Sequence, residues 1–226
     1  MNHDGYFDRE YFQLTAGKIR YLDYLIRLLQ RSGVAKGSVL DLGSGYGFLL
    51  ERLERAGYQA SGLEQSAHAA GESRRRSSAA VHVQSAEEPF RLPDGAFDAV
   101  TILDLIEHLR DGRSCLRECH RVLRPGGVVI VLTLNSGSAV RPLLGRQWSW
   151  FKDPTHVHLY SRTELATGMR ESGFDLLASR TLFNFCTAGE STPFLKPLQR
   201  IGRVVELPLL GDTLLAGGPP CQPFSK

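Results

Sequence analysis

The stretch that decides the fold is residues 39–47, Val-Leu-Asp-Leu-Gly-Ser-Gly-Tyr-Gly. Its first four residues form a short apolar run with one acid, which is typical of a buried parallel strand. Three glycines then alternate through a tight turn, and glycine both tolerates positive φ and lets a ligand approach the backbone. Residues 48–55 follow with the apolar spacing of a helix. A strand, a glycine turn and a helix in this order predict a nucleotide-type pocket at the helix N-terminus.

The spacing of the glycines distinguishes a dinucleotide-binding turn from other nucleotide-binding turns. The dinucleotide fingerprint is G-x-G-x-x-G, but here its third glycine would fall at Phe48, which counts against a nicotinamide dehydrogenase. With Asp41 just before the first glycine, the stretch resembles the first motif of the class I S-adenosylmethionine (SAM) dependent methyltransferases. SAM carries an ammonium group and a sulfonium cation, and both favour nearby carboxylates.

The resemblance implies a set of cofactor contacts at this turn. In the family the turn passes beneath the methionine part of SAM, and the acid at the strand end helps to hold its amino group. The residues that these roles assign are Asp41, Gly43, Ser44, Gly45 and Gly47.

Two further segments extend the predicted cofactor pocket. Glu64 lies at the end of the second predicted strand, where ligands of open α/β sheets bind, and a carboxylate there can accept both ribose hydroxyls. The family has an acid at this place, so Glu64 is the predicted ribose ligand, with Gln65 beside it. The loop after the third predicted strand holds the adenine in the family, which implies contacts for Ala86 and Glu87.

Polar residues follow the fourth predicted strand in the segment that, in the family, borders the methyl group and the substrate. Asp104 is therefore assigned to the cofactor. The pair Glu107-His108 is common in the subgroup resembling the quinone-biosynthesis methyltransferases, types 11 and 23. His108 can act as a general base because its natural pKa lies near neutrality, or it can brace the next helix.

The long connection over residues 135–160 brings a second candidate base, since loops over a strand end often supply substrate residues. His156 and His158 alternate, so in extended backbone they point opposite ways and one can face a substrate. His156 is the predicted catalytic alternative to His108. A metal site would need a third ligand, none is evident, and no metal is predicted.

The fold that the resemblance implies is a Rossmann-like α/β sandwich of three layers. Its sheet is expected to have seven strands, mostly parallel, with helices on both faces and an antiparallel last hairpin. A helix over 116–123, an Arg-Pro-Gly-Gly turn and a following strand resemble a later structural motif of the family, so the likeness covers residues 39–134. The predicted strands are 39–42, 58–64, 79–84, 97–104, 128–134, one that begins at 173–177, and 213–216.

The chain divides into three predicted regions: a helical lid or packing segment over 1–36, a SAM-binding core over 37–182, and a C-terminal segment over 183–226 that holds the last strand. Apolar residues between Phe194 and Val205 approach helical spacing beside basic residues. A packing helix is one interpretation, and an interfacial helix with peripheral membrane contact is the other.

Composition narrows the function classes. The chain has 226 residues, enough for one α/β domain, and its net charge of +3 is too mild to indicate nucleic acid. The N-terminus lacks the basic and apolar regions of a signal peptide, and no apolar run reaches about 18 residues. Cys115 and Cys119 fit one face of a helix better than a zinc site. A reduced, cytoplasmic setting is the simplest interpretation.

Residues 217–225, Gly-Gly-Pro-Pro-Cys-Gln-Pro-Phe-Ser, give a conflicting signal. They resemble the catalytic motif of DNA cytosine-C5 methyltransferases, in which a Cys thiolate attacks a flipped-out base. In that family the motif follows the fourth strand, a place that Asp104 occupies here. Cytosine chemistry at Cys221 is therefore the weaker hypothesis.

The predicted function is methyl transfer from SAM to an oxygen, nitrogen or carbon atom of a small molecule, with S-adenosyl-L-homocysteine (SAH) as the product. Lipid- and quinone-like compounds are among the candidate acceptors. The rival from another class is a catalytically silent SAM-fold subunit that binds or regulates. The sequence identifies neither the acceptor nor the oligomeric state, because acceptor loops have no transferable code.

Overall fold

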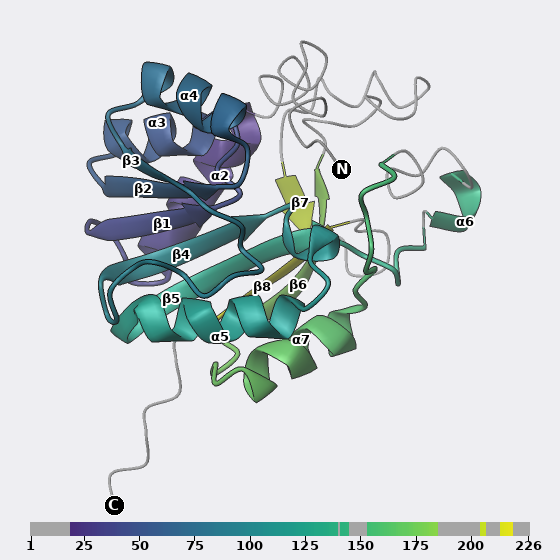
Figure 1. The fold of residues 1–226 in the computed structure, drawn as a ribbon. Helices are drawn as coiled ribbons and strands as arrows, with labels where there is room; N and C mark the ends of the chain where they lie inside the picture. Colours follow the sequence, from purple (N-terminus) through teal and green to yellow (C-terminus); the bar gives the residue numbers. More distant parts are fainter. Residues whose placement is uncertain (1–18, 140, 145–152, 185–203, 207–212, 219–226) are drawn as a thin grey trace, which may run out of the picture.

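The computed structural model describes residues 19–139, 141–144, 153–184, 204–206 and 213–218 (Figure 1). The helices are α2 (Ile19–Arg31), α3 (Phe48–Arg55), α4 (Ala67–Arg76), α5 (Gly112–Val122), α6 (Arg141–Leu144) and α7 (Arg162–Glu171), with a short 3₁₀ helix η2 (Ile106–His108). The strands are β1 (Ser38–Leu42), β2 (Gln59–Glu64), β3 (Ala80–Val83), β4 (Phe97–Leu103), β5 (Leu123–Leu134), β6 (Ala178–Asn184), β7 (Val204–Glu206) and β8 (Thr213–Gly218).

All of these strands belong to one sheet, in the order β3-β2-β1-β4-β5-β8-β6-β7. The first five strands of that order are mutually parallel. β8 runs antiparallel to both of its neighbours, β5 and β6, and β7 pairs antiparallel with β6. The mostly parallel Rossmann-like sheet and its antiparallel end are confirmed. The predicted count of seven strands was wrong, since the described residues form eight.

Helices cover both faces of the sheet and make the molecule three-layered (Figure 1). Alternate residues of β5 pack against the helices on opposite faces of the sheet. Val128, Ile130 and Leu132 pack in the cluster that includes α2 and α3, whereas Val129 and Val131 pack in the cluster that includes α5 and α7. A strand buried on both faces needs the continuous apolar run that the sequence provides.

Two secondary-structure predictions were wrong in the C-terminal third. The sixth strand begins at Ala178 rather than at 173–177. Gly173, at φ +91°, turns the chain after α7, and Phe174 is buried in the core without continuing a strand. The apolar spacing predicts a helix through Val205, but Val204 and Val205 lie in β7. Both residues are β-branched, which favours a strand, and both pair with β6.

Other expectations are confirmed or lie beyond the described ranges. α2, α3 and α5 form where the sequence predicts helices, and the buried Cys115 and Cys119 lie on α5 with free thiols. Residues 1–18, Phe194, Leu198 and Cys221 lie outside the described residues, so the lid, the interfacial helix and the terminal motif stay predictions. In the part of the chain that the structure describes, no helix combines the length and apolarity needed to cross a membrane.

Candidate functional site

The glycine turn has the backbone conformation that its sequence predicts. Gly43, Gly45 and Gly47 have φ values of +68°, +51° and +76°, in the left-handed region that favours glycine. Gly47 is the N-cap of α3, so the turn ends directly at a helix N-terminus. Gly43 N–H donates to the carbonyl of Leu63 at 2.8 Å, which fastens the turn to the end of β2.

Glu64 ties the second strand to this turn. Its two carboxylate oxygens accept the N–H of Gly45 at 2.9 Å and the N–H of Ser66, the N-cap of α4, at 2.8 Å. The side chain is buried, at 3% exposure. These two bonds fix the orientation of the Glu64 carboxylate, the predicted ribose ligand, at the end of β2. The neighbouring Gln65 is exposed.

Asp41 lies beneath the turn in β1 and is buried, accepting a hydrogen bond from Thr101 Oγ1 at 2.7 Å. Burial raises the pKa of Asp41 to about 7, the Thr101 hydrogen bond opposes this rise, and the nearby Glu64 charge adds to it. A cation in the pocket would relieve the repulsion between these two acids. The site therefore favours a ligand with positive charge, such as the ammonium and sulfonium groups of SAM.

The ends of β3 and β4 lie on the same edge of the sheet as the glycine turn. Gln84 N–H, just after β3, donates to the carbonyl of Glu64 at 3.0 Å, so the predicted adenine loop starts beside the predicted ribose ligand. In that loop Ala86 is buried, and the exposed Glu87 accepts the N–H of Arg110 at 2.7 Å. Asp104 is exposed after β4 and, at φ +47°, is the non-glycine residue with positive φ among those described.

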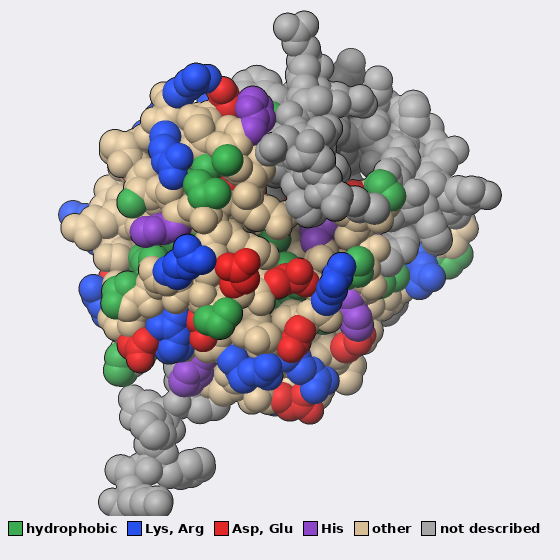
Figure 2. Space-filling model, in the orientation of Figure 1, with side chains coloured by type: hydrophobic (Ala, Val, Ile, Leu, Met, Phe, Trp, Pro, Cys, Tyr) green, Lys and Arg blue, Asp and Glu red, His purple; other side chains and the backbone are tan. Residues whose placement is uncertain are grey.

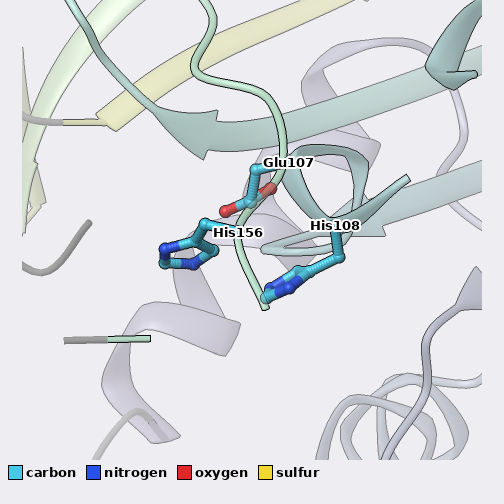
Figure 3. A group of neighbouring side chains, drawn as sticks. All are labelled: Glu107, His108 and His156. Carbon is cyan, nitrogen blue, oxygen red and sulfur yellow. The ribbon is translucent and has the colours of Figure 1, made fainter. Parts of the chain in front are cut away.

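The two candidate bases lie together although 48 positions separate them in the sequence. The rings of His108 and His156 have centroids 4.7 Å apart (Figure 3). Backbone N–H groups of Val157 and His158 donate to the carbonyl of Glu107 at 2.9 and 3.0 Å, which fastens the segment carrying His156 onto η2. The alternation prediction is confirmed: the His156 side chain is 8% exposed, whereas His158 is 45% exposed and pairs with Glu164.

A short hydrogen-bond chain assigns the protons of His108. Thr155 Oγ1 donates its hydrogen to Asp153 Oδ1 and lies 2.8 Å from His108 Nδ1. The hydroxyl has one hydrogen, so it accepts from Nδ1–H, which leaves Nε2 as the basic nitrogen. Burial lowers the pKa of His108 below its usual value, the neighbouring His156 lowers it further, and Asp153 opposes this. His108 is therefore neutral near pH 7.

Glu107 is the residue of this group that sequence reasoning did not assign. It is buried, at 1% exposure, and its Oε2 accepts a hydrogen bond from Thr133 Oγ1 at 2.8 Å. Glu107, His108 and His156 each offer one ligand atom, all within 4.8 Å of one another, so the three could hold a cation (Figure 3). The sequence makes no third ligand evident, and the structure places Glu107, the sequence neighbour of His108, beside both histidines; the prediction of no metal stays a prediction.

Comparison with known proteins identifies the family. A family model described as a methyltransferase domain matches residues 13–179. The chain belongs to this methyltransferase family. The ubiquinone biosynthesis O-methyltransferase of Sodalis glossinidius is 38% identical to this methyltransferase over 120 residues, which are 50% of the chain and 47% of that protein. The corresponding protein of Aromatoleum aromaticum is 32% identical over 165 residues, 68% of the chain and 69% of that protein.

A solved structure supports the fold of this methyltransferase. A SAM-dependent methyltransferase of Thermotoga maritima, described as a possible histamine N-methyltransferase, superposes with a TM-score of 0.70 at 22% identity, covering 94% of this chain and 95% of that one. The predictions of a class I SAM-dependent methyltransferase, of its likeness to quinone-biosynthesis enzymes and of SAM as cofactor are confirmed. The roles of the individual site residues stay predictions.

Proposed function

We propose that this methyltransferase moves a methyl group from SAM to a hydroxyl oxygen of a small, quinone-like acceptor. The observation that carries the proposal is the half-buried pair His108 and His156, in contact beyond the end of β4, on the same sheet edge as the glycine turn. Its relatives are named for an O-methylation in ubiquinone biosynthesis, which supports an oxygen acceptor of this class.

The chemistry is a one-step displacement at sulfonium. The acceptor oxygen forms a bond to the methyl carbon while the carbon–sulfur bond breaks, and SAH leaves as a neutral thioether. A hydroxyl must lose its proton during this step, and neutral His108, with Nε2 free to accept, is suited to take it. Because the methyl donor is already activated, holding acceptor and donor in line supplies much of the rate.

The same residues offer a second way to promote loss of the proton. A divalent cation held by Glu107, His108 and His156 would bind the acceptor oxygen and lower its pKa. The two routes differ in their response to a chelator. Loss of turnover in EDTA, restored by added Mg²⁺ or Zn²⁺, favours the cation; unchanged turnover favours histidine alone.

The test is transfer from SAM with a labelled methyl group into a cell extract, followed by separation into lipid-extractable, small polar, protein and nucleic-acid fractions. We expect label in the lipid-extractable fraction. The matched control is Gly47→Val, in which the turn is disrupted and no fraction should gain label. No label despite intact SAH binding would support the silent subunit, and label in DNA would support chemistry at Cys221.

Cytoplasmic location and peripheral membrane contact belong to this proposal as well. A lipid-extractable acceptor would bring the chain to a membrane surface, and co-sedimentation with liposomes measures that contact directly. The division into segments 1–36, 37–182 and 183–226 is tested by limited proteolysis, which should release a stable fragment close to the central one.

A further inference from the structure

The connection between β3 and β4 holds its shape without regular secondary structure. Residues 84–95 contain no helix or strand, yet Ala86 and Phe90 are 7% and 4% exposed, and Leu92 is 9% exposed. Backbone N–H and C=O groups in such a segment need partners when water is excluded. Side chains provide several of these partners here, and three of the bonds come from Glu118 and Arg121 of α5.

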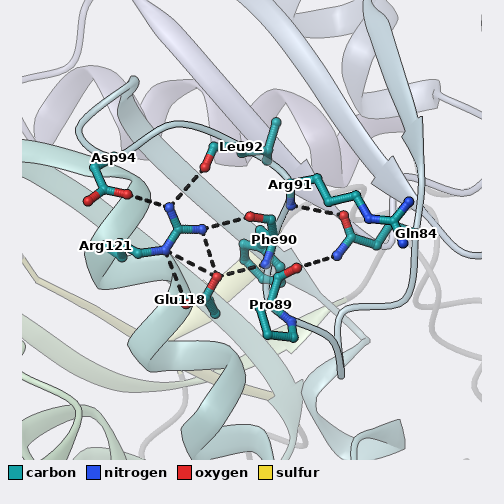
Figure 4. A network of polar contacts seen from close by, with 8 residues as sticks. All are labelled: Gln84, Pro89, Phe90, Arg91, Leu92, Asp94, Glu118 and Arg121. Carbon is teal, nitrogen blue, oxygen red and sulfur yellow. Dashed lines mark hydrogen bonds and ion pairs between the residues drawn. The ribbon is translucent and has the colours of Figure 1, made fainter.

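Glu118 and Arg121 of α5 together hold Phe90 at both of its backbone groups (Figure 4). Glu118 Oε2 accepts the Phe90 N–H at 2.7 Å, and Arg121 Nη2 donates to the Phe90 carbonyl at 2.8 Å. Arg121 Nη1 donates to the carbonyl of Leu92 at 2.9 Å and pairs with Asp94 at 2.5 Å. The planar fork of a guanidinium can make these bonds at once, whereas an ammonium is a point charge.

The same segment is held from its other end by Gln84. Gln84 Nε2 donates to the carbonyl of Pro89 at 2.6 Å, and its Oε1 accepts the N–H of Arg91 at 3.1 Å (Figure 4). The Glu118–Arg121 pair is itself fixed by an ion pair of 2.7 Å. Between Gln84 and α5, the loop that carries Ala86 and Glu87 has little freedom to move.

We propose that Glu118, Arg121 and Gln84 are positioning residues for the adenine end of SAM. They touch no reacting atom; they fix the backbone of 85–92 so that Ala86 and its neighbours meet the adenine ring in a preformed pocket. The inference rests on the proposed function, because it needs this loop to bind adenine. Preorganisation of this kind raises affinity by removing the entropy cost of ordering the loop when the ligand binds.

The test separates adenine recognition from general stability by using two ligands. SAH and S-inosylhomocysteine differ only at the base, where the amino group of adenine is replaced by the carbonyl of hypoxanthine. Kd is measured for both by titration calorimetry with the full-length chain. We expect Arg121→Gln to bind SAH about tenfold more weakly than the wild type, and the preference for SAH over its inosyl analogue to fall several-fold. Arg121→Lys should show an intermediate loss.

The control is Arg113→Gln on the same helix. Arg113 pairs with Glu171 of α7 at 2.6 Å rather than with the 84–95 segment, so both Kd values should stay within twofold of wild type. If Arg121→Gln does not fold, Gln84→Met provides the test. It removes the two bonds from Gln84 to the loop without changing the net charge, and it should lower the preference for SAH over the inosyl analogue.

Each result of these titrations either supports or overturns the inference. A fall in the SAH preference with Arg113→Gln unchanged supports the inference. Equal losses for both ligands, or no loss in either Arg121→Gln or Gln84→Met, would overturn it by showing a structural role alone. A wild-type chain that binds neither ligand would instead overturn the proposed function, and the inference with it.

Discussion

The predicted cofactor side and the proposed acceptor side of this site are built differently. The cofactor side is joined across neighbouring parallel strands: the Gly43 N–H bonds to the end of β2, and the Glu64 carboxylate bonds to the turn and to the N-cap of α4. The acceptor side is joined by contacts between His108 and His156, which come from segments far apart in the chain. A substitution on the cofactor side should therefore weaken or abolish SAH binding. A substitution on the acceptor side should lower kcat and leave SAH binding intact.

The largest effect is expected at the glycine turn. Gly47 has φ +76°, and a Cβ there would press on Ser73 of α4. Gly47→Val should abolish detectable SAH binding and lower the free energy of unfolding by about 3 kcal/mol. Calorimetry and urea denaturation measure the two effects. Gly71→Ala in α4, where a Cβ meets open space, is the matched control and should leave both values unchanged. Wild-type SAH affinity in Gly47→Val would contradict the assignment of this turn.

The acceptor side should give the next largest effect, on rate alone. His108→Gln and His156→Gln should each lower kcat by about 100-fold, the usual contribution of a positioned base, while the Kd for SAH stays within twofold. Steady-state kinetics and calorimetry separate the two quantities. His158→Gln, two positions from His156 but solvent-exposed, is the control and should keep wild-type kcat. Equal loss of kcat in all three variants would show that His108 and His156 have no catalytic role of their own.

Glu64 tests whether one carboxylate serves both the turn and the cofactor. Glu64→Gln places an NH₂ group against one of two backbone N–H donors, so SAH affinity should fall roughly 30-fold, or about 2 kcal/mol. Equilibrium titration of SAH gives the value. Glu72→Gln, on the exposed face of α4, provides the comparison and should bind normally. Equal affinities for the two variants would rule out Glu64 as the ribose ligand.

The smallest effect is a pH dependence that Asp41 gives to the cofactor side. Its pKa of about 7 in the folded protein lies above the usual 3.8, so the ligand-free protein binds a proton that the unfolded chain releases. The stability that this group contributes is therefore full below about pH 4 and is lost as pH rises through 7.

A cationic ligand prefers ionised Asp41, so SAM should bind about tenfold more tightly at pH 8 than at pH 6. Asp41→Asn should remove this dependence and stabilise the ligand-free protein at pH 8. Calorimetry at the two pH values and thermal melts of both proteins provide the measurement. A pH-independent Kd in the wild type would mean that the SAM cation does not meet Asp41.

The contrast also explains which features the sequence could predict. Positive φ at Gly43, Gly45 and Gly47, and an acid at the end of β2, are local consequences of residue type and strand order, so the turn and its neighbouring carboxylate could be predicted. The pairing of His108 with His156 depends on how a long connection folds back, and that path is set by tertiary contacts such as those of Val157 and His158 to the Glu107 carbonyl.

The errors in the fold have the same origin. Phe174 supplies an apolar signal that looks like the start of a strand, although it packs in the core before β6 begins. β7 lies at the edge of the sheet with three residues, too short for its periodicity to outweigh the helical spacing of the preceding segment. The sequence likewise left two roles open for His108, as a general base or as a brace for the next helix. The choice between them depends on which residues lie beside the ring, and sequence spacing does not reveal those.

The position of β8 has a consequence for how the protein is made. This strand lies between β5 and β6, and it follows both of them in the chain. During synthesis from the N-terminus, the parallel part of the sheet can assemble as soon as β5 has emerged, while the facing edges of β5 and β6 wait for residues 213–218. Those edges are open to wrong pairing in the interval. The sheet is therefore completed only late in synthesis, when β8 inserts between β5 and β6 and pairs with both.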